Sequence, residues 1–291
     1  MTKTICLAMA LVATGVLGCS KKDVTTTDSS AAESVKGTVR ASGSSALVPL
    51  VNAAKEKFEA KNPGIGIEVS AGGSKKGIAD VASGAVHIGN SDIPAPKDLE
   101  GQLVDHKVAV VPFAIVANKG SFNASVTAIT MEQLAGVLRG QVKDWSELGG
   151  EAQPIVLINR APSSGTRAVV GQVVLGGDDF AEGRTEDNSG ALVAKLRQTK
   201  GALSYVGVSY VTDELLTLAI ETKNGVGKPT FEDIQAGRYP LWSYEHMFTK
   251  GEPTGATKLF LDYVLSPEFQ REVLPNVKGF FPAIEVQQAA R

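Results

Sequence analysis

The sequence predicts an α/β fold built from mostly parallel sheets covered by helices. Short runs of alternating apolar residues are each followed by runs whose apolar residues recur every three or four positions, so strands alternate with helices. Gly and Ala are plentiful and aromatic residues make up only 6% of the chain, which is ordinary α/β composition. At 291 residues the chain is large enough for two lobes.

The N-terminal segment has the pattern of an export signal. Lys3 precedes an apolar run, Ile5 to Leu17, which has the length of a signal-peptide core and is too short to span a bilayer. The run ends in Leu17-Gly18-Cys19, which resembles a bacterial lipobox and implies removal of residues 1–18 and lipidation of Cys19. An ordinary signal peptide cut nearby is the alternative. Residues 19–36 are polar and are expected to form a flexible tether.

The charge and the cysteine content of the chain limit which functions and which stabilising bonds are possible. The chain has 29 basic and 31 acidic residues, so it lacks the basic surface of a nucleic-acid-binding protein. Its two cysteines, Cys6 and Cys19, both lie in the N-terminal segment. The folded part therefore has no internal disulfide, and its core must supply the stability.

The folded part is expected to begin near Gly37, with a strand over 38–41 and a helix over 46–61. Ser45 is the expected N-cap of that helix, and Pro49 lies in its first turn, where the missing N–H does little harm. The next elements repeat this order. They are a strand over 65–69, the turn Gly72-Gly73-Ser74, a helix over 75–83, and a strand over 86–90 that leads to Asp92.

A long apolar run at 107–118 predicts a strand that passes between two lobes. Thr130 and Gln133 have the spacing of a capping box that opens a helix ending near Arg139. Further elements are expected as a strand over 154–159, helices over 168–175, 191–198, 255–265 and 267–274, strands over 204–211 and 216–220, and a return crossing over 239–242.

The turn from Arg160 to Arg167 is the most informative stretch, because it joins a strand to a helix and carries three hydroxyls, a glycine and Arg160. The N–H groups at a helix start and the helix dipole attract anions. A guanidinium adds a planar fork that matches a tetrahedral oxyanion. Taken alone, the segment is better explained as a simple cap and turn, and the rest of the chain changes that balance.

The placement of these polar residues favours a binding site. Ser45, Ser74, Asp92 and Ser164 all directly follow strands, and ligands of parallel sheets bind at the carboxyl ends of strands. Asp92 would repel an anion unless the ligand itself donates a proton. Phosphate keeps a P–OH group near neutral pH, whereas sulfate does not. Asp92 is therefore expected to accept the ligand's proton, the alternative being a solvated loop carboxylate or a helix cap.

The chain resembles the phosphate-binding proteins of bacterial Pst-type phosphate ABC importers, which are type II periplasmic binding proteins. The matching segments, in family order over roughly 37–283, are 43–50, 73–77, 88–92, 160–167, 201–206, 239–241 and 260–268. The resemblance implies two α/β lobes joined by two crossing strands. We expect lobe one at 37–112 with 240–291, and lobe two at 113–239.

The resemblance also implies which residues bind phosphate. They are Ser45, Ala46, Leu47, Ser74, Asp92, Arg160, Ser164, Gly165 and Thr166. Arg160 is expected to be held by a carboxylate. The chain departs from the family pattern at Lys75-Lys76, two cations after Ser74, and at Asn90, where a small residue is common.

The expected function is extracytoplasmic capture of inorganic phosphate by a monomer that is lipid-anchored to a bacterial membrane, without metal or cofactor, and delivery to an ABC permease complex in the inner membrane. The alternatives are a binder of sulfate, molybdate or a phosphonate, and a sensory or adhesive lipoprotein that does not serve transport. An enzyme such as a phosphoesterase is disfavoured. The chain lacks a G-x-S-x-G motif, and His87, His106 and His246 have no metal-ligand spacing.

Overall fold

The computed structural model describes residues 35–119, 126–177 and 179–283. The strands are β1 (Gly37–Gly43), β2 (Ile65–Ala71), β3 (Ile88–Ser91), β4 (Leu103–Asn118), β5 (Ala128–Thr130), β6 (Val156–Arg160), β7 (Arg184–Glu186), β8 (Ala202–Gly207), β9 (Leu215–Thr222), β10 (Gly225–Gly227) and β11 (Trp242–Lys250). The helices are α1 (Val48–Lys61), α2 (Ser74–Ser83), α3 (Met131–Leu138), α4 (Gly165–Val170), α5 (Ser189–Gln198), α6 (Phe231–Gln235) and α7 (Gly255–Val264).

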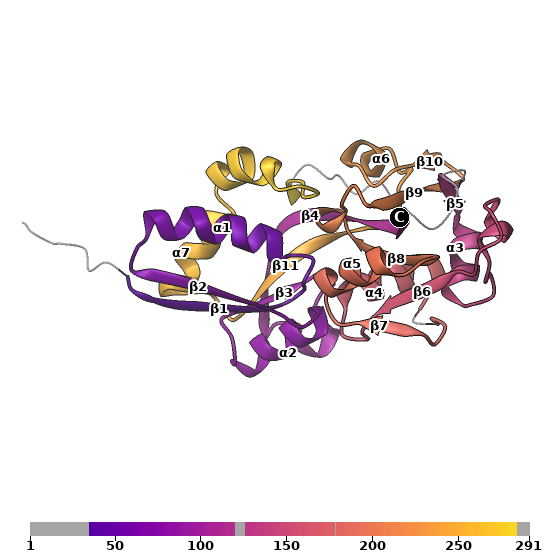
Figure 1. The fold of residues 1–291 in the computed structure, drawn as a ribbon. Helices are drawn as coiled ribbons and strands as arrows, with labels where there is room; N and C mark the ends of the chain where they lie inside the picture. Colours follow the sequence, from indigo (N-terminus) through magenta and orange to yellow (C-terminus); the bar gives the residue numbers. More distant parts are fainter. Residues whose placement is uncertain (1–34, 120–125, 178, 284–291) are drawn as a thin grey trace, which may run out of the picture. The chain divides into compact units, whose positions relative to one another are not determined.

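The strands form two groups that share β4. In the first group β2, β1 and β3 are parallel, β11 is antiparallel to β3, and β4 is in turn antiparallel to β11. In the second group β4 pairs with β8 and β9, and β8 is followed by β6 and β7, which are parallel to it. Helices α1, α2 and α7 lie beside the first group, and α3, α4 and α5 lie beside the second (Figure 1).

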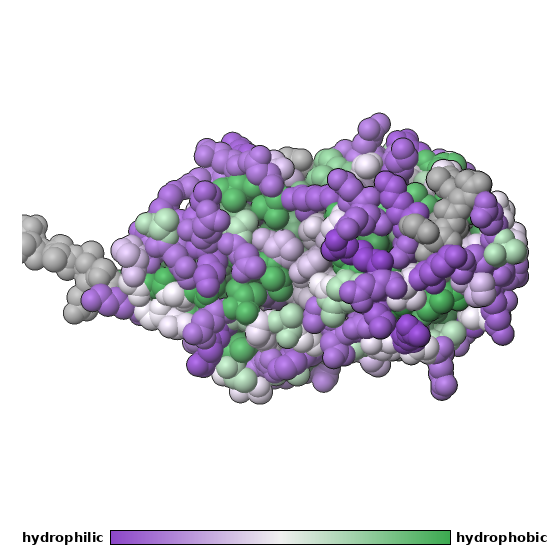
Figure 2. Space-filling model, viewed as in Figure 1, coloured by the Kyte–Doolittle hydropathy of each residue, from purple (hydrophilic) through white to green (hydrophobic). Residues whose placement is uncertain are grey.

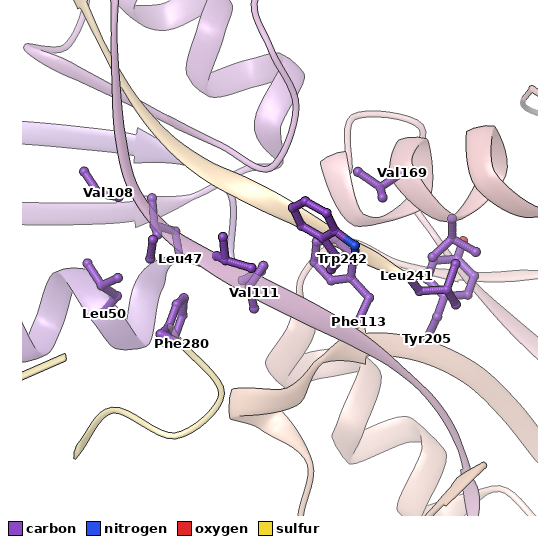
Figure 3. Close-up of a cluster of buried hydrophobic side chains, with 14 of the residues drawn as sticks. Leu47, Leu50, Val108, Val111, Phe113, Val169, Tyr205, Leu241, Trp242 and Phe280 are labelled. Atoms are coloured by element: carbon purple, nitrogen blue, oxygen red, sulfur yellow. The ribbon is translucent and has the colours of Figure 1, made fainter. Parts of the chain in front are cut away.

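The strand β4 crosses from one group to the other, as its long apolar run predicted. Its first part, up to Pro112, pairs with β11, and its second part, from Phe113, pairs with β8 and β9. The stretch from Val108 to Ala117 is buried, which is typical of a strand covered on both faces. Figure 3 shows Val111 and Phe113 on this strand beside Leu241 and Trp242 of the returning chain.

The returning chain is hydrogen-bonded to β4 where the two strands cross. The Phe113 amide donates to the Leu241 carbonyl at 2.8 Å, and the Tyr239 hydroxyl donates to the Phe113 carbonyl at 2.7 Å. Both Tyr239 and Leu241 are buried. The predicted return crossing is therefore confirmed, and it continues into β11.

The structure shifts the boundaries of several predicted elements, and three of these shifts concern segments next to the polar residues described below. The helix expected from Ala46 begins at Val48, with Leu47 as its N-cap. The helix expected from Ala168 begins at Gly165, because the Ser164 hydroxyl caps it. The strand expected over 204–211 ends at Gly207, where a short turn of helix begins. At α4 the side-chain hydrogen bond of the cap decides where the helix begins, whereas α1 begins without a side-chain cap.

The predicted signal peptide at 1–18, Cys19 and most of the predicted tether lie outside the described residues. Within the part of the chain that the structure describes, no helix is long and apolar enough to span a membrane. The face in Figure 2 is covered mainly by polar side chains, with apolar ones scattered between them. Such scattered apolar residues are normal for a protein surface.

Candidate functional site

Arg160, the last residue of β6, lies in a cluster of buried polar groups. Its side chain is 1% exposed, and its Nη2 donates to the Ser45 hydroxyl at 3.0 Å. Its Nη1 donates to the Ser189 hydroxyl at 3.4 Å. Burial lowers the pKa of Arg160, and the negative charges of Asp92 and Asp187 partly oppose this effect. A guanidinium nevertheless keeps its proton in proteins, so the cluster holds a buried cation.

The expectation that a carboxylate holds Arg160 is not met among the described residues. There, no carboxylate lies within ion-pair distance of the guanidinium, and its side-chain partners are serine hydroxyls. Asp92 and Asp187 act on it only through longer-range attraction. A buried cation with neutral partners keeps more of its field available to an anion than one already neutralised by an ion pair.

Ser45 belongs to the site but does not cap α1. Its hydroxyl accepts from the Ser189 amide at 3.1 Å and shares a hydrogen bond with the Ser189 hydroxyl at 3.0 Å. Its carbonyl accepts from the Tyr210 hydroxyl at 2.8 Å. The hydroxyl is thus engaged across the site with Ser189 and Arg160, which is why it is not available to the first amides of α1.

Ala46 and Leu47 connect Ser45 to α1. The Ala46 amide donates to the Ser44 hydroxyl at 3.0 Å, so this predicted donor already has a partner within its own turn. The Leu47 side chain is fully buried in the apolar core, beside Leu50 and Val111 (Figure 3). The structure therefore places both residues next to the polar cluster, where only their backbone groups could contact a ligand.

The turns before α2 and α4 are in direct contact. The Lys75 amide donates to the Ser163 carbonyl at 3.1 Å. A Cβ atom on Gly165 would lie 2.1 Å from the Ser74 hydroxyl oxygen, and one on Gly73 would lie 2.6 Å from the Ser163 carbonyl oxygen. Glycine is thus required at both positions for the turns to meet. Gly73 also has a φ of +87°, which disfavours other residues.

Asp92 follows β3 and is fixed by its own backbone and by Thr166. Its amide donates to the Ser74 hydroxyl at 2.9 Å, and its carbonyl accepts from the Ser243 hydroxyl at 2.6 Å. The Thr166 hydroxyl donates to Asp92 Oδ2 at 2.7 Å. Asp92 is 1% exposed, and its Oδ1 has no hydrogen-bond partner among the described residues. Asp92 is therefore a buried carboxyl with one acceptor oxygen in reserve, not a solvated loop carboxylate.

Ser164 has the capping role that the sequence left open. Its hydroxyl accepts from the Arg167 amide at 3.2 Å and thereby starts α4 at Gly165. Arg167 in turn donates from Nη1 to the Arg160 carbonyl at 3.1 Å, which fixes the end of β6 against the first turn of α4. The capping interpretation is confirmed for Ser164, and the cap also sets the position of Thr166 and Arg160.

Several buried polar atoms at or near the cluster have no hydrogen-bond partner among the described residues, among them both side-chain polar atoms of Asn90 and both carboxyl oxygens of Glu245, and one donor and one acceptor lie within the cluster itself. These two are Arg160 Nε and Asp92 Oδ1. A buried polar group without a partner costs about 1–3 kcal/mol. A ligand that accepts one hydrogen bond and donates another would satisfy both atoms, and a protonated oxyanion has this property. Within the same described ranges, no group of three or more His, Cys, Asp or Glu side chains is arranged to hold a metal ion.

Comparison with known proteins identifies the family. The model of the PBP superfamily domain matches residues 28–268. The chain is 42% identical over 284 residues to the phosphate-binding protein PstS of Bacillus subtilis, which covers 96% of this chain and 91% of that protein. The chain belongs to the PstS family. It is also 25% identical over 311 residues to PstS of Pseudomonas aeruginosa, with 96% of this chain and 94% of that protein covered.

Solved structures related to the PstS family have the same fold. A putative phosphate ABC transporter substrate-binding protein from Clostridium perfringens, crystallised with phosphate, matches with a TM-score of 0.78 and 25% identity, over 84% of this chain and 99% of that chain. An ABC-type phosphate transport receptor from Vibrio cholerae matches with a TM-score of 0.67 and 22% identity, over the same shares. The predicted two-lobed type II periplasmic binding protein fold is confirmed.

Sequence reasoning missed three groups at or beside this polar cluster. Ser189 lies at the first position of α5, after the N-cap Asn188, and so repeats the strand–hydroxyl–helix pattern that marked the other turns. That signal was available. Tyr210 follows β8 in a short helical turn and gave no signal. Glu245 lies within β11 and is fully buried, and a single carboxylate in a strand does not reveal its burial from sequence.

Proposed function

We propose that this PstS-family chain is an extracytoplasmic solute-binding protein that captures inorganic phosphate between its two lobes and delivers it to an ABC permease. The observation that carries the proposal is the buried pair of unpartnered atoms, the donor Arg160 Nε and the acceptor Asp92 Oδ1. The named relatives support it, because they are phosphate-binding or substrate-binding proteins rather than enzymes, and one solved relative holds phosphate.

The chemistry of the pair favours phosphate over sulfate. Phosphate near neutral pH accepts hydrogen bonds through its charged oxygens and donates one through P–OH. Sulfate only accepts, so it would leave an acceptor facing Asp92. A site that pairs a ligand hydroxyl can reject analogues that lack it by roughly 10⁴–10⁵. Asp92 as proton acceptor is thus the proposed basis of anion discrimination.

The proposed ligand-binding groups are those that surround these two atoms. Arg160 supplies the buried positive charge, and hydroxyls and amides at helix starts supply neutral donors. They come from Ser45, Ala46, Leu47, Ser74, Ser164, Gly165 and Thr166. For the Ala46 amide this role requires exchange of its bond to Ser44, because that hydroxyl now accepts its proton.

The placement in the cell is the remaining part of the proposal. Residues 1–18 are proposed to be a lipoprotein signal peptide and Cys19 the lipidated residue, with residues 19–36 as the tether of a monomer.

The lobe boundaries are proposed at 37–112 with 240–291, and at 113–239, so that the two crossings fall on β4 and on residues just before β11. When a ligand binds between two lobes that are joined in this way, the lobes close around it.

A calorimetric titration of the folded domain with phosphate, alone and in excess sulfate, tests the proposal. The protein is first unfolded and refolded to remove bound anions. We expect 1:1 binding that sulfate does not disturb. Binding abolished by sulfate would indicate a general oxyanion site, and absence of phosphate binding would contradict the proposed ligand.

The variant Asp92→Asn tests the proton acceptor in the same titration. An amide in place of the carboxylate can no longer accept the ligand proton in the same way, so we expect weaker phosphate binding or reduced discrimination against sulfate. The matched control is Asp98→Asn, which changes an exposed aspartate a few residues away. Unchanged affinity and unchanged discrimination in Asp92→Asn would contradict the role of Asp92.

A further inference from the structure

Glu245 lies directly beside Asp92 although it is remote from it in sequence. Strand β11 runs between β3 and β4, and the pairing of His246 with Ser91 places Glu245 next to the residue that follows Ser91. The register of β11 against β4 shifts between Glu245 and His246. Two residues earlier, the Ser243 hydroxyl donates to the Asp92 carbonyl at 2.6 Å. This hydrogen bond attaches β11 to the Asp92 loop close to Glu245.

The register of β11 against β3 places Glu245 beside Asp92, and the negative charge of Asp92 acts on the Glu245 carboxyl. Glu245 is 0% exposed, and no N–H or hydroxyl group among the described residues donates to either of its oxygens. Burying two neighbouring carboxylates, one of which receives no hydrogen bond at all, is strongly unfavourable, so one of the two carries a proton. The pair therefore holds a single negative charge, shared between two buried side chains.

The surroundings decide which of the two carboxyls holds the proton. Asp92 accepts a hydrogen bond from Thr166, and it attracts the Arg160 guanidinium. A hydrogen-bond donor and a nearby cation are the partners that a carboxylate anion requires when it is buried. Glu245 has no such support, and its cross-strand neighbour on β4 is Ala109. Burial raises the pKa of the Glu245 carboxyl well above its ordinary value, and Asp92 raises it further. The proton therefore belongs on Glu245.

The charged groups on the elements around Glu245 are mostly engaged elsewhere. On β4, Lys107 lies over the Tyr244 ring at 4.8 Å, and Asp105 lies 2.8 Å from His246 of β11 itself. On α2, which packs against β11, Lys76 pairs with Asp80 and Lys75 is exposed. Asp92 is thus the charged group that acts on Glu245.

We infer that Glu245 is a buried neutral carboxylic acid that donates a hydrogen bond to Asp92 and so holds the Asp92 carboxylate in the orientation that accepts the proton of a bound oxyanion. It is a positioning residue, because it acts through Asp92. The inference rests on the proposed function for its ligand, but the protonation of Glu245 in the folded protein does not depend on that ligand. It also explains how an anion site accommodates two carboxyl groups with only one negative charge.

The protonation of Glu245 is tested by NMR on folded protein labelled with ¹³C at the glutamate carboxyl carbons. We expect one resonance to keep the chemical shift of a protonated carboxyl across the ordinary titration range of glutamate. This resonance should be missing in Glu245→Gln and present in Glu252→Gln, which changes an exposed glutamate. A spectrum in which every glutamate titrates normally, or in which the unusual resonance survives in Glu245→Gln, would overturn the inference.

The positioning role is tested by phosphate titration of Glu245→Gln and Glu245→Leu. Glutamine keeps a neutral donor at the site, so we expect affinity within a few-fold of the parent protein. Leucine removes the donor, and the loss of a hydrogen bond to a charged group should weaken binding by roughly tenfold or more. Equal affinities for the two variants would overturn the positioning role, whether both match the parent or both are weak. A parent protein that does not bind phosphate would contradict the proposed function, and the NMR result would then still decide the protonation of Glu245.

Discussion

Asp92 receives hydrogen bonds from distant parts of the chain, and this decides what it can do. Thr166 donates to Oδ2, and the Glu245 carboxyl is its other side-chain contact. The backbone of Asp92 is fixed by Ser74 and Ser243. A carboxylate held from all these directions loses little conformational entropy when a ligand arrives, which is the advantage of a preorganised site.

Glu245 should make the ligand-free protein less stable as pH rises. In the unfolded chain Glu245 releases its proton near its ordinary pKa of 4.5, whereas the folded protein keeps the proton well above that pH. The folded state thus binds more protons in this window, so its free energy of unfolding falls as pH increases. Glu245→Gln has no such proton. Its stability relative to the parent should rise with pH from about 4.5 upward, by at most about 1.4 kcal/mol per pH unit.

Urea denaturation of the parent and of Glu245→Gln at a series of pH values measures this difference. The substitution Glu252→Gln, which changes an exposed glutamate, is the control for the loss of one glutamate carboxyl. Parallel stability curves for parent and Glu245→Gln would show that Glu245 titrates alike in the folded and unfolded chain.

At the scale of elements, the site depends on helix starts that meet at close range. Gly165, at the first position of α4, lies against Ser74, at the first position of α2, where an added Cβ would come within 2.1 Å of the hydroxyl oxygen and 2.9 Å of the Asp92 Cβ. The absence of a side chain at Gly165 therefore allows the two helix N-termini and Asp92 to share one site.

Gly165→Ala should weaken phosphate binding while the protein remains folded. The added methyl group forces the turns before α2 and α4 apart, and overpacking of this kind costs about 1–3 kcal/mol. Because the strain arises where the two turns meet around the ligand, we expect phosphate affinity to fall by between several-fold and about a hundredfold. Titration calorimetry measures it. The control is Gly177→Ala, where an added Cβ has no atom within 4 Å. Equal affinities for the two variants would contradict the contact.

The capping box at α3 is a test of an element far from the site. The Thr130 hydroxyl accepts from the Gln133 amide at 3.1 Å, and the Gln133 side chain accepts from the Thr130 amide at 3.0 Å. Thr130→Ala should lower the free energy of unfolding by about 1 kcal/mol. Thr254→Ala is a matched control, because Thr254 has the same position at α7 but makes no capping hydrogen bond. Chemical denaturation should show a clear loss in the first variant only.

These elements show which features can be predicted from the sequence. The capping box of Thr130 and the long strand through Pro112 were predictable, because each depends on neighbouring residues or on a continuous apolar run. The position of the Ser45 hydroxyl was not, because its partner Ser189 is 144 residues away. Glu245 was missed for the same reason. Local patterns give the order of strands, turns and helices, while the partners of a buried polar group depend on how the strands are arranged.

At the scale of the whole molecule, β4 and the chain entering β11 are the connections that set the two groups of strands against each other. The N–H and the C=O group of Phe113 are both hydrogen-bonded to this returning chain, and the surrounding side chains are buried. The polar contacts of the site also bridge the two groups, since Ser45 follows β1 whereas Arg160 ends β6. A ligand bound there should therefore stabilise the complete domain rather than one part of it.

Phosphate should raise the thermal unfolding midpoint of the domain, because a ligand that binds only the folded state stabilises it by about 2.7 kcal/mol at a concentration one hundred times its Kd. Sulfate also stabilises proteins in general, because it is excluded from their surface, so the informative quantity is the difference between the two anions at equal ionic strength. We expect a higher midpoint in phosphate than in sulfate for the parent, and a smaller difference for Asp92→Asn. Equal midpoints in the two anions for the parent would mean that the buried donor and acceptor do not distinguish a protonated oxyanion from a fully ionised one.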